Sequence, residues 1–418
     1  MKSPREYGLP YDAWRPGQQL AIRTALHART PHVVLQAPTG AGKSIIAAAL
    51  TKMDRGRGII LTATKALEDQ YAQSFPHLYD VRGMSNYECL AARDEFKRWF
   101  RLRAPHALIT CDDGPCRSGQ QCSLAKDGCL YFDRVRGAVA SHAVLTNYMY
   151  YLTMRRFSRG LGVADRLICD EAHALPEELM AAYRIDIPFS LNPPALPYPE
   201  DRDHLPKVIA EWREWAAGRL EGLRPAGEQN EDVRHRHTKQ VDALSQLLKI
   251  DETWAWDVGG SGVTFEPTIP ALLFPLLADP TTTSHLVYLS ATITPAMLAL
   301  LNIDPATVTF REMASRFPVE RRPVYLVESV RVDHKMTGDH LAYWLSRIDK
   351  IIGQRLDRKG IVHTVSYARA EFLCKHSRHR GIFVAPRRAS ELARAIAAFK
   401  SMPPPAVLIS PSVATGFD

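Results

Sequence analysis

Residues 37–44 read Ala-Pro-Thr-Gly-Ala-Gly-Lys-Ser and decide the fold expected of this 418-residue chain. An apolar run, His32 to Leu35, precedes them and a helix-forming run, Ile45 to Leu50, follows. This order of strand, loop and helix is typical of a phosphate-binding loop, here with alanine at the first glycine position, and argues against a chance match. The glycines let backbone N–H groups close on phosphates, Lys43 neutralises phosphate oxygens, and the Ser44 hydroxyl ligates magnesium. We therefore expect the chain to bind ATP and Mg²⁺.

Short runs rich in Val, Ile and Leu recur along the chain, with helix-like stretches between them. Continuous apolar character bounded by turn residues is typical of strands that are buried on both faces of a parallel sheet. The predicted fold class is therefore α/β. The further runs expected to form strands are Gly58 to Leu61, Ala143 to Leu145, Arg166 to Cys169, His285 to Leu289, Pro323 to Val327, Gly360 to Val365, Gly381 to Val384 and Ala406 to Ile409.

Composition and charge narrow the class of protein. Hydrophobic residues make up 46% and charged residues 23% of the chain, which is average for globular proteins, and the length suits several domains. The net charge of +8 favours a polyanionic partner to a modest degree. No apolar run approaches the roughly 18 residues of a membrane span, and residues 1–10 offer no signal-peptide core. We expect a cytoplasmic protein without a membrane partner.

An acidic tetrapeptide, Asp-Glu-Ala-His at residues 170–173, directly follows the apolar residues 167–169. It places two carboxylates at the C-terminal end of a strand, where α/β sheets bind ligands. Asp170 is expected to hold magnesium through its water shell, and Glu171 to polarise the attacking water. Alone, the tetrapeptide could be a helix N-cap, but its position after the phosphate-binding loop favours catalysis. The expected catalytic residues are Lys43, Asp170, Glu171 and His173.

Three further stretches complete a pattern of five motifs. Arg-Pro-Gly-Gln at residues 15–18 stands ahead of the phosphate-binding loop, Thr-Ala-Thr-Lys at 62–65 follows a predicted strand, and Ser-Ala-Thr at 290–292 follows another. Each alone could be a strand end or a cap, but in this order they resemble helicases of superfamily 2. The resemblance implies that Gln18 reads adenine, that residues 62–65 touch the nucleic-acid backbone, and that hydrolysis is coupled to strand movement by Ser290, Ala291 and Thr292.

The resemblance becomes more specific towards the end of the chain, where residues 315–323, 359–367 and 410–418 are similar to the second motor domain of the DinG and XPD group. The chain stops at Asp418, ahead of that group's final Gln-x-x-Gly-Arg motif, and we expect a fragment of a longer protein that carries the motif's arginine finger. The resemblance implies nucleotide contacts from Arg15, Gln18, Pro38, Thr39, Gly40, Ala41, Gly42, Lys43, Ser44, Gly416 and Asp418.

Five of the seven cysteines lie within residues 89–129. In a reducing compartment such a cluster indicates a metal before a disulfide, and four thiolates can hold either a [4Fe-4S] cluster or zinc. Residues 83–89 and 128–131, together with Pro115-Cys116, are similar to the iron-sulfur insert of the DinG and XPD relatives, which favours iron. Cys111 is not expected to be a ligand. The expected ligands are Cys89, Cys116, Cys122 and Cys129.

Residues 96–103 interleave aromatic and cationic side chains. This composition suits single-stranded DNA, although the helical spacing of the aromatic residues fits core packing equally well. The nucleic-acid contacts expected from this stretch and from the motifs are Thr64, Lys65, Lys97, Arg98, Arg101, Ser366 and Tyr367.

The resemblance implies two RecA-like P-loop motor domains, with a cysteine-rich iron-sulfur insert and a helical arch in the first. Its expected parts are residues 1–83, 133–175 and 285–314 for the first motor, 84–132 for the insert, 176–284 for the arch and 315–418 for the second motor. Such a protein unwinds tailed or forked DNA by translocating 5′ to 3′ on single-stranded DNA, in repair, replication or defence. The alternatives are an ATP-dependent nucleic-acid clamp and a P-loop ATPase that acts on another substrate.

Overall fold

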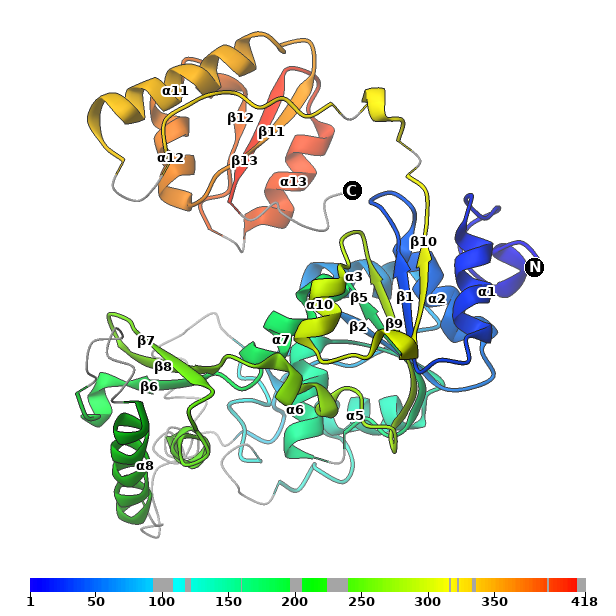
Figure 1. The fold of residues 1–418 in the computed structure, drawn as a ribbon, viewed down its shortest axis with the longest axis vertical. Helices are drawn as coiled ribbons and strands as arrows, with labels where there is room; N and C mark the ends of the chain where they lie inside the picture. The colour runs from blue at the N-terminus through cyan, green and yellow to red at the C-terminus, as the bar shows by residue number, and fades with distance from the viewer. Residues whose placement is uncertain are drawn as a thin grey trace. The chain divides into compact units, whose positions relative to one another are not determined.

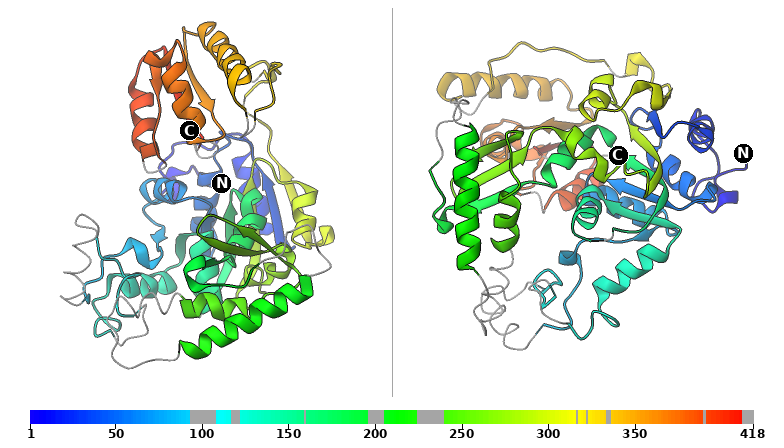
Figure 2. Two further views of the ribbon diagram at one scale, coloured as in Figure 1. Left: turned by 90° about the vertical axis from the view of Figure 1, so that its left-hand side faces the viewer. Right: turned by 60° about the horizontal axis from the view of Figure 1, so that its bottom comes forward.

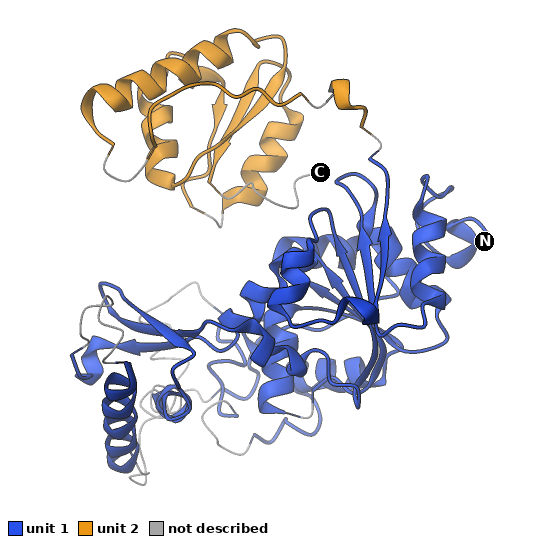
Figure 3. Ribbon diagram, viewed as in Figure 1, with its two compact units in different colours: residues 1–316 blue, residues 317–418 orange. Residues whose placement is uncertain are grey.

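A computed structural model describes residues 1–92, 108–116, 122–158, 160–195, 205–223, 240–315, 317–321, 323–332, 336–388 and 391–411. The chain divides into two compact units, residues 1–316 and 317–418 (Figure 3). None of the described helices is long and apolar enough to cross a membrane.

The first unit is built on a seven-stranded sheet in which every strand pair is parallel (Figure 1). This confirms the α/β class with a parallel central sheet. The strand β10, of which only two positions are apolar, was not predicted. In spatial order the strands are β10 (Val308–Glu312), β1 (His32–Gln36), β9 (Thr283–Ser290), β5 (Ala164–Asp170), β2 (Gly58–Thr62), β4 (Ala143–Asn147) and β3 (Tyr79–Asp80).

Helices cover both faces of this sheet, because neighbouring residues of a strand point to opposite sides. Val33 and Ile60 belong to one core cluster, whereas Val34 and Ile59 belong to the other. The cluster of Val33 also takes apolar side chains from α1 (Gln18–His27), α2 (Lys43–Met53) and α3 (Lys65–Ser74), and the cluster of Val34 from α5 (Leu130–Ala140), α6 (Tyr148–Phe157), α7 (Leu175–Ala181) and α10 (Pro295–Leu300).

The segment between β5 and β9 forms a separate small core beside the sheet (Figure 1, Figure 2). Its helices are α8 (Leu205–Gly222) and residues 240–247, and they pack on an antiparallel sheet of β6 (Ile185–Pro188), β8 (Gly262–Pro267) and β7 (Trp254–Val258). Among the described residues this segment carries both helices and a three-stranded sheet, and the sheet was not predicted. The sequence did contain a signal for strand β8. Apolar and polar residues alternate within residues 262–267, directly after a Gly-Gly-Ser turn, and their burial alternates in the structure.

The second unit contains a parallel sheet in the order β11 (Lys359–His363), β13 (Ala406–Ser410) and β12 (Phe383–Val384), with helices α11 (Gly338–Gly353), α12 (Tyr367–His376) and α13 (Leu392–Ser401). The strand expected at residues 323–327 does not form. Val324 is 95% and Leu326 100% exposed, and no described strand pairs with this segment. Apolar character alone does not make a strand where no neighbour offers hydrogen bonds.

Candidate nucleotide and nucleic-acid site

The predicted motifs of the first unit meet at one edge of the seven-stranded sheet. Strands β1, β9 and β5 are adjacent and parallel, so their C-terminal ends lie side by side. β1 leads into the phosphate-binding loop, β9 ends at Ser290, and β5 ends at Asp170. Three motifs that are far apart in the sequence are thereby brought together at the edge where parallel sheets bind ligands.

The phosphate-binding loop depends on glycine at two positions. Gly40 and Gly42 have φ values of 76° and 80°, which strain any other residue. At Gly42 a Cβ atom would also come within 2.5 Å of the Gln18 Nε2 atom. Ala37 replaces a glycine without cost, since its φ is not positive, and its N–H donates to the Ser290 carbonyl oxygen at 2.8 Å.

Gln18 and Arg15 hold the backbone of this loop. The Gln18 amide accepts from the Arg15 N–H at 2.8 Å and donates to the Ala41 carbonyl oxygen at 2.8 Å. The Arg15 guanidinium donates to the Gly40 carbonyl oxygen at 2.7 Å. The sequence predicts that Gln18 reads the nucleotide base, whereas here both ends of its buried amide are engaged by protein groups.

An ion pair crosses the site from the loop to the acidic motif. Lys43 Nζ lies 3.1 Å from Glu171 Oε1, and the two side chains are 13% and 20% exposed. The other Glu171 oxygen lies 3.4 Å from His173 Nδ1, which also lies 2.8 Å from Ser290 Oγ. A polar chain therefore runs from the P-loop lysine to the end of β9.

Asp170 is buried and receives two hydrogen bonds. Tyr71 donates its hydroxyl to Asp170 Oδ2 at 2.6 Å, and the Glu171 N–H donates to Oδ1 at 2.9 Å. Burial raises the pKa of Asp170 to about 6, while the Tyr71 bond acts in the opposite direction. A divalent cation beside this carboxylate would favour its ionised form. Tyr71 and its bond were not predicted, since 99 positions separate the two residues.

The expected nucleic-acid contacts are distributed over both units. Thr64 caps α3 by accepting from the Leu67 N–H at 3.2 Å, and Lys65 opens that helix. In the second unit, Ser366 caps α12, and Tyr367 is the first residue of that helix. Outside the described part of the chain lie three further candidates for nucleic-acid contacts, Lys97, Arg98 and Arg101, and two expected nucleotide contacts, Gly416 and Asp418.

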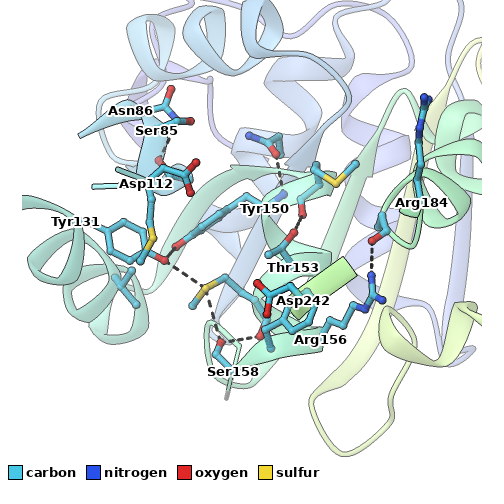
Figure 4. Close-up of a pocket in the computed structure, with 18 of the residues that line it drawn as sticks. Ser85, Asn86, Asp112, Tyr131, Tyr150, Thr153, Arg156, Ser158, Arg184 and Asp242 are labelled. Carbon is cyan, nitrogen blue, oxygen red and sulfur yellow. Dashed lines mark hydrogen bonds between the residues drawn. The ribbon is translucent and has the colours of Figure 1, made fainter. Parts of the chain in front are cut away.

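A cavity of about 1100 Å³ opens in the first unit, between α6, the cysteine-rich segment and the segment that follows β5 (Figure 4). Lys65 and Cys116 both line it. Its wall includes Tyr131 and Tyr150, whose hydroxyls are 3.1 Å apart, and Arg156, which donates to the Ala182 carbonyl oxygen at 2.7 Å. Sequence reasoning missed these three residues, although the aromatic run at residues 148–151 was a visible signal.

The expected cysteine ligands lie near one another. An antiparallel bridge joins Glu88 to Thr110, and Cys89 is buried beside it. Burial raises the pKa of the Cys89 thiol, Cys122 and Cys129 raise it further, and the N–H groups of Ala91 and Ala92 lower it. Burial and the same thiols, with Cys89, raise the pKa of Cys116 to about 11.

Two observations bear on whether this cluster fits a metal. A Cβ atom on Gly114 would come within 2.6 Å of Cys89 Sγ, so the glycine leaves the space that this sulfur occupies. Backbone N–H groups directed at a sulfur are the hydrogen bonds that stabilise a ligating thiolate. However, among the residues that the structure describes, no three His, Cys, Asp or Glu side chains already have the geometry of a metal site. The donor set thus fits a cluster, and its arrangement is not that of a finished metal site.

Comparison with known proteins agrees with the motifs and the fold. Residues 15–113 match the family model described as DEAD/DEAH box helicase. Residues 15–113 are thus similar to a DEAD/DEAH box helicase domain, and the fold of the chain is similar to that of XPD. A solved XPD helicase is 14% identical, with 94% of this chain and 78% of that chain covered and a TM-score of 0.55. This helicase domain implies ATP hydrolysis, with ATP and Mg²⁺ bound and nucleic acid as partner.

Other solved structures are less similar. Xpd4 from S. tokodaii is 14% identical, with 95% of this chain and 80% of that chain covered and a TM-score of 0.48. Dbp5 from S. cerevisiae, bound to RNA and ADP BeF3, is 12% identical, with 100% and 78% covered and a TM-score of 0.43. No curated protein sequence matches the chain.

Proposed function

We propose that this helicase is a DNA-unwinding motor that moves 5′ to 3′ on single-stranded DNA and carries a [4Fe-4S] cluster. The observation that carries the proposal is the meeting of Lys43, Asp170 and Glu171 at one edge of the parallel sheet. Phosphoryl transfer needs a cation on the phosphates, a carboxylate for magnesium and a group that orients water, and these three residues supply them. The direction and the preference for DNA rest on the resemblance to DinG and XPD.

Hydrolysis assigns one role to each residue of the site. Lys43 would leave Glu171 and bind the phosphates, Ser44 would ligate magnesium, and Asp170 would hold magnesium through its water shell. Glu171 then accepts a hydrogen bond from the attacking water. His173 contacts both Glu171 and Ser290, so a change at the phosphates reaches the Ser290-Ala291-Thr292 element at the end of β9. That element is proposed to couple hydrolysis to strand movement.

The cavity beside α6 is the proposed path of the single strand in the first unit. Its aromatic side chains offer surfaces on which bases stack, and Lys65 offers a cation for the backbone phosphates. The cysteine-rich segment forms part of its wall through Asp112 and Cys116. The expected cations on residues 97–101 belong to the same segment. We assign residues 84–132 to an iron-sulfur insert and 176–284 to an arch on this basis.

Cys89, Cys116, Cys122 and Cys129 are the proposed ligands of the cluster. When bound, the cluster would cross-link a segment that holds few apolar residues of its own. Cys111 is also buried, next to the same group of thiols. The resemblance to DinG and XPD, which covers the other four cysteines, is the ground for leaving it out.

Strand displacement from tailed duplexes tests the proposal. With ATP and Mg²⁺, the protein should unwind DNA with a 5′ single-stranded tail and not DNA with a 3′ tail, and single-stranded DNA should stimulate ATP hydrolysis. If single-stranded DNA stimulates ATP hydrolysis but no strand is displaced, the protein is an ATP-dependent clamp. If nucleic acid does not change the rate of ATP hydrolysis, the protein is an ATPase that acts on another substrate.

A further inference from the structure

Helix α3 connects the proposed strand path to the magnesium ligands. Lys65, Glu68 and Tyr71 are three residues apart and share one face of the helix. Lys65 lines the cavity, whereas Glu68 and Tyr71 are completely buried. The helix therefore has one end at the cavity and its interior next to Asp170.

The Tyr71 hydroxyl contacts one of the two residues expected to hold magnesium. It donates to Asp170 Oδ2 at 2.6 Å. Burial and the Asp170 carboxylate raise the pKa of Tyr71 well above its usual value, so the phenol keeps the proton that it donates. Asp170 accepts this hydrogen bond at one oxygen, which leaves carboxylate lone pairs for a cation or its water shell.

We propose that Tyr71 is a positioning residue that orients the Asp170 carboxylate for magnesium, and that it ties this orientation to the position of α3. The inference rests on the proposed nucleotide site. Its physical basis is that groups which hydrogen-bond to metal ligands orient them, and their removal typically weakens metal binding or activity about 10- to 100-fold. Because Tyr71 belongs to α3 and hydrogen-bonds to the last residue of β5, a shift of α3 caused by nucleic acid would reach the Asp170 carboxylate.

Two other buried tyrosines provide comparisons. Tyr148 donates to the backbone carbonyl oxygen of Asp170 at 2.9 Å and therefore touches the same residue without touching its carboxylate. The hydroxyl of Tyr288 lies 2.9 Å from His32 Nδ1, away from the nucleotide site. All three side chains are fully buried, so replacement by phenylalanine removes one hydroxyl from a similar environment in each case.

The test is the Tyr71→Phe variant of the full chain, titrated with a fluorescent, non-hydrolysable ATP analogue in Mg²⁺ and in EDTA. We expect affinity in Mg²⁺ to fall about 10- to 100-fold and affinity in EDTA to change less than about twofold. Tyr288→Phe should behave as the parent protein. Equal losses in Mg²⁺ and EDTA, or no loss in either, would overturn the inference.

A double variant covers the case in which the single change perturbs folding. If Tyr71 acts by orienting Asp170, adding Tyr71→Phe to Asp170→Ala should cost less affinity in Mg²⁺ than Tyr71→Phe costs alone. Additive losses would show that Tyr71 acts independently of Asp170, contrary to the inference. If the parent protein binds the ATP analogue with the same affinity in Mg²⁺ and in EDTA, the proposed function itself is contradicted.

Discussion

Lys43 and Glu171 form an ion pair across the nucleotide site, with 3.1 Å between Nζ and Oε1. The cation proposed to bind phosphate and the carboxylate proposed to orient water are thus each other's partner in this structure. Phosphate and carboxylate compete for the same ammonium group. Nucleotide binding should therefore release the Glu171 carboxylate.

Lys43→Ala should reduce ATP turnover below about 1% of the parental rate, because the phosphates lose their principal cation. DNA binding should change little, since Lys43 lies at the nucleotide site and not on the cavity. Lys65→Ala is the matched control and should show the reverse pattern. Release of phosphate and fluorescence anisotropy of a labelled single strand measure the two properties. Parental turnover in the Lys43 variant would mean that the nucleotide site is misassigned.

Glu171→Gln should retain ATP binding but slow hydrolysis at least about 100-fold, because an amide is a poor acceptor for the water proton. Glutamine keeps the side-chain length at a residue whose φ of 50° already strains the backbone. Single-turnover hydrolysis and equilibrium binding separate the two effects. Glu177→Gln, on α7, is the control. An equal loss of binding and hydrolysis would argue that Glu171 is structural.

Anaerobically purified protein should be brown and contain about four iron and four sulfide per chain. Cys116→Ser should bleach the colour and impair unwinding more than basal ATP hydrolysis, because the nucleotide groups lie outside the cysteine-rich segment. Cys111→Ser should keep its iron. A colourless protein with one zinc would reject the iron assignment, and a Cys116→Ser protein with full iron would reject that ligand.

The free energy of unfolding of the Glu68→Gln variant, measured relative to that of the parent protein, should be higher at pH 8 than at pH 5.5. Burial is the largest cause that raises the pKa of Glu68 to about 7, while the Asn147 amide, 3.2 Å away, lowers it. A raised carboxyl pKa means that the folded state binds the proton more tightly than the unfolded state. The parent therefore loses stability from about pH 4.5 to pH 7, by up to about 3 kcal/mol.

Thermal unfolding across this pH range measures the effect of the Glu68 change. The neutral glutamine does not titrate, so the variant does not lose stability in this pH range as the parent does. The free energy of unfolding of the variant minus that of the parent should therefore increase with pH. Asp69→Asn is the control, because Asp69 is half exposed and pairs with Arg82, whose guanidinium also lies 3.8 Å from the Glu68 carboxylate. A difference that is constant with pH would mean that Glu68 does not titrate in this range.

The sequence was informative where a motif directly follows a strand. Residues 37–44 and 170–173 are fixed to the ends of β1 and β5, so their meeting follows once the sheet is parallel. Tyr71 could not be predicted, because its contact with Asp170 depends on how α3 packs on β4 and β2, of which β2 is the neighbour of β5 in the sheet. Residues 323–327 have the apolar content of a strand, but strand formation depends on a neighbour that local sequence does not reveal.

The position of β9 between β1 and β5 has a consequence for synthesis of the chain. Both neighbours of β1, β9 and β10, come after the long segment that follows β5. At translation rates of about 5–20 residues per second, the roughly 250 residues between β1 and β9 take about 12–50 s to emerge. Throughout that interval the strand that leads into the phosphate-binding loop has two open edges, which are sites for aggregation. The nascent chain should therefore need a chaperone until residues 283–312 leave the ribosome.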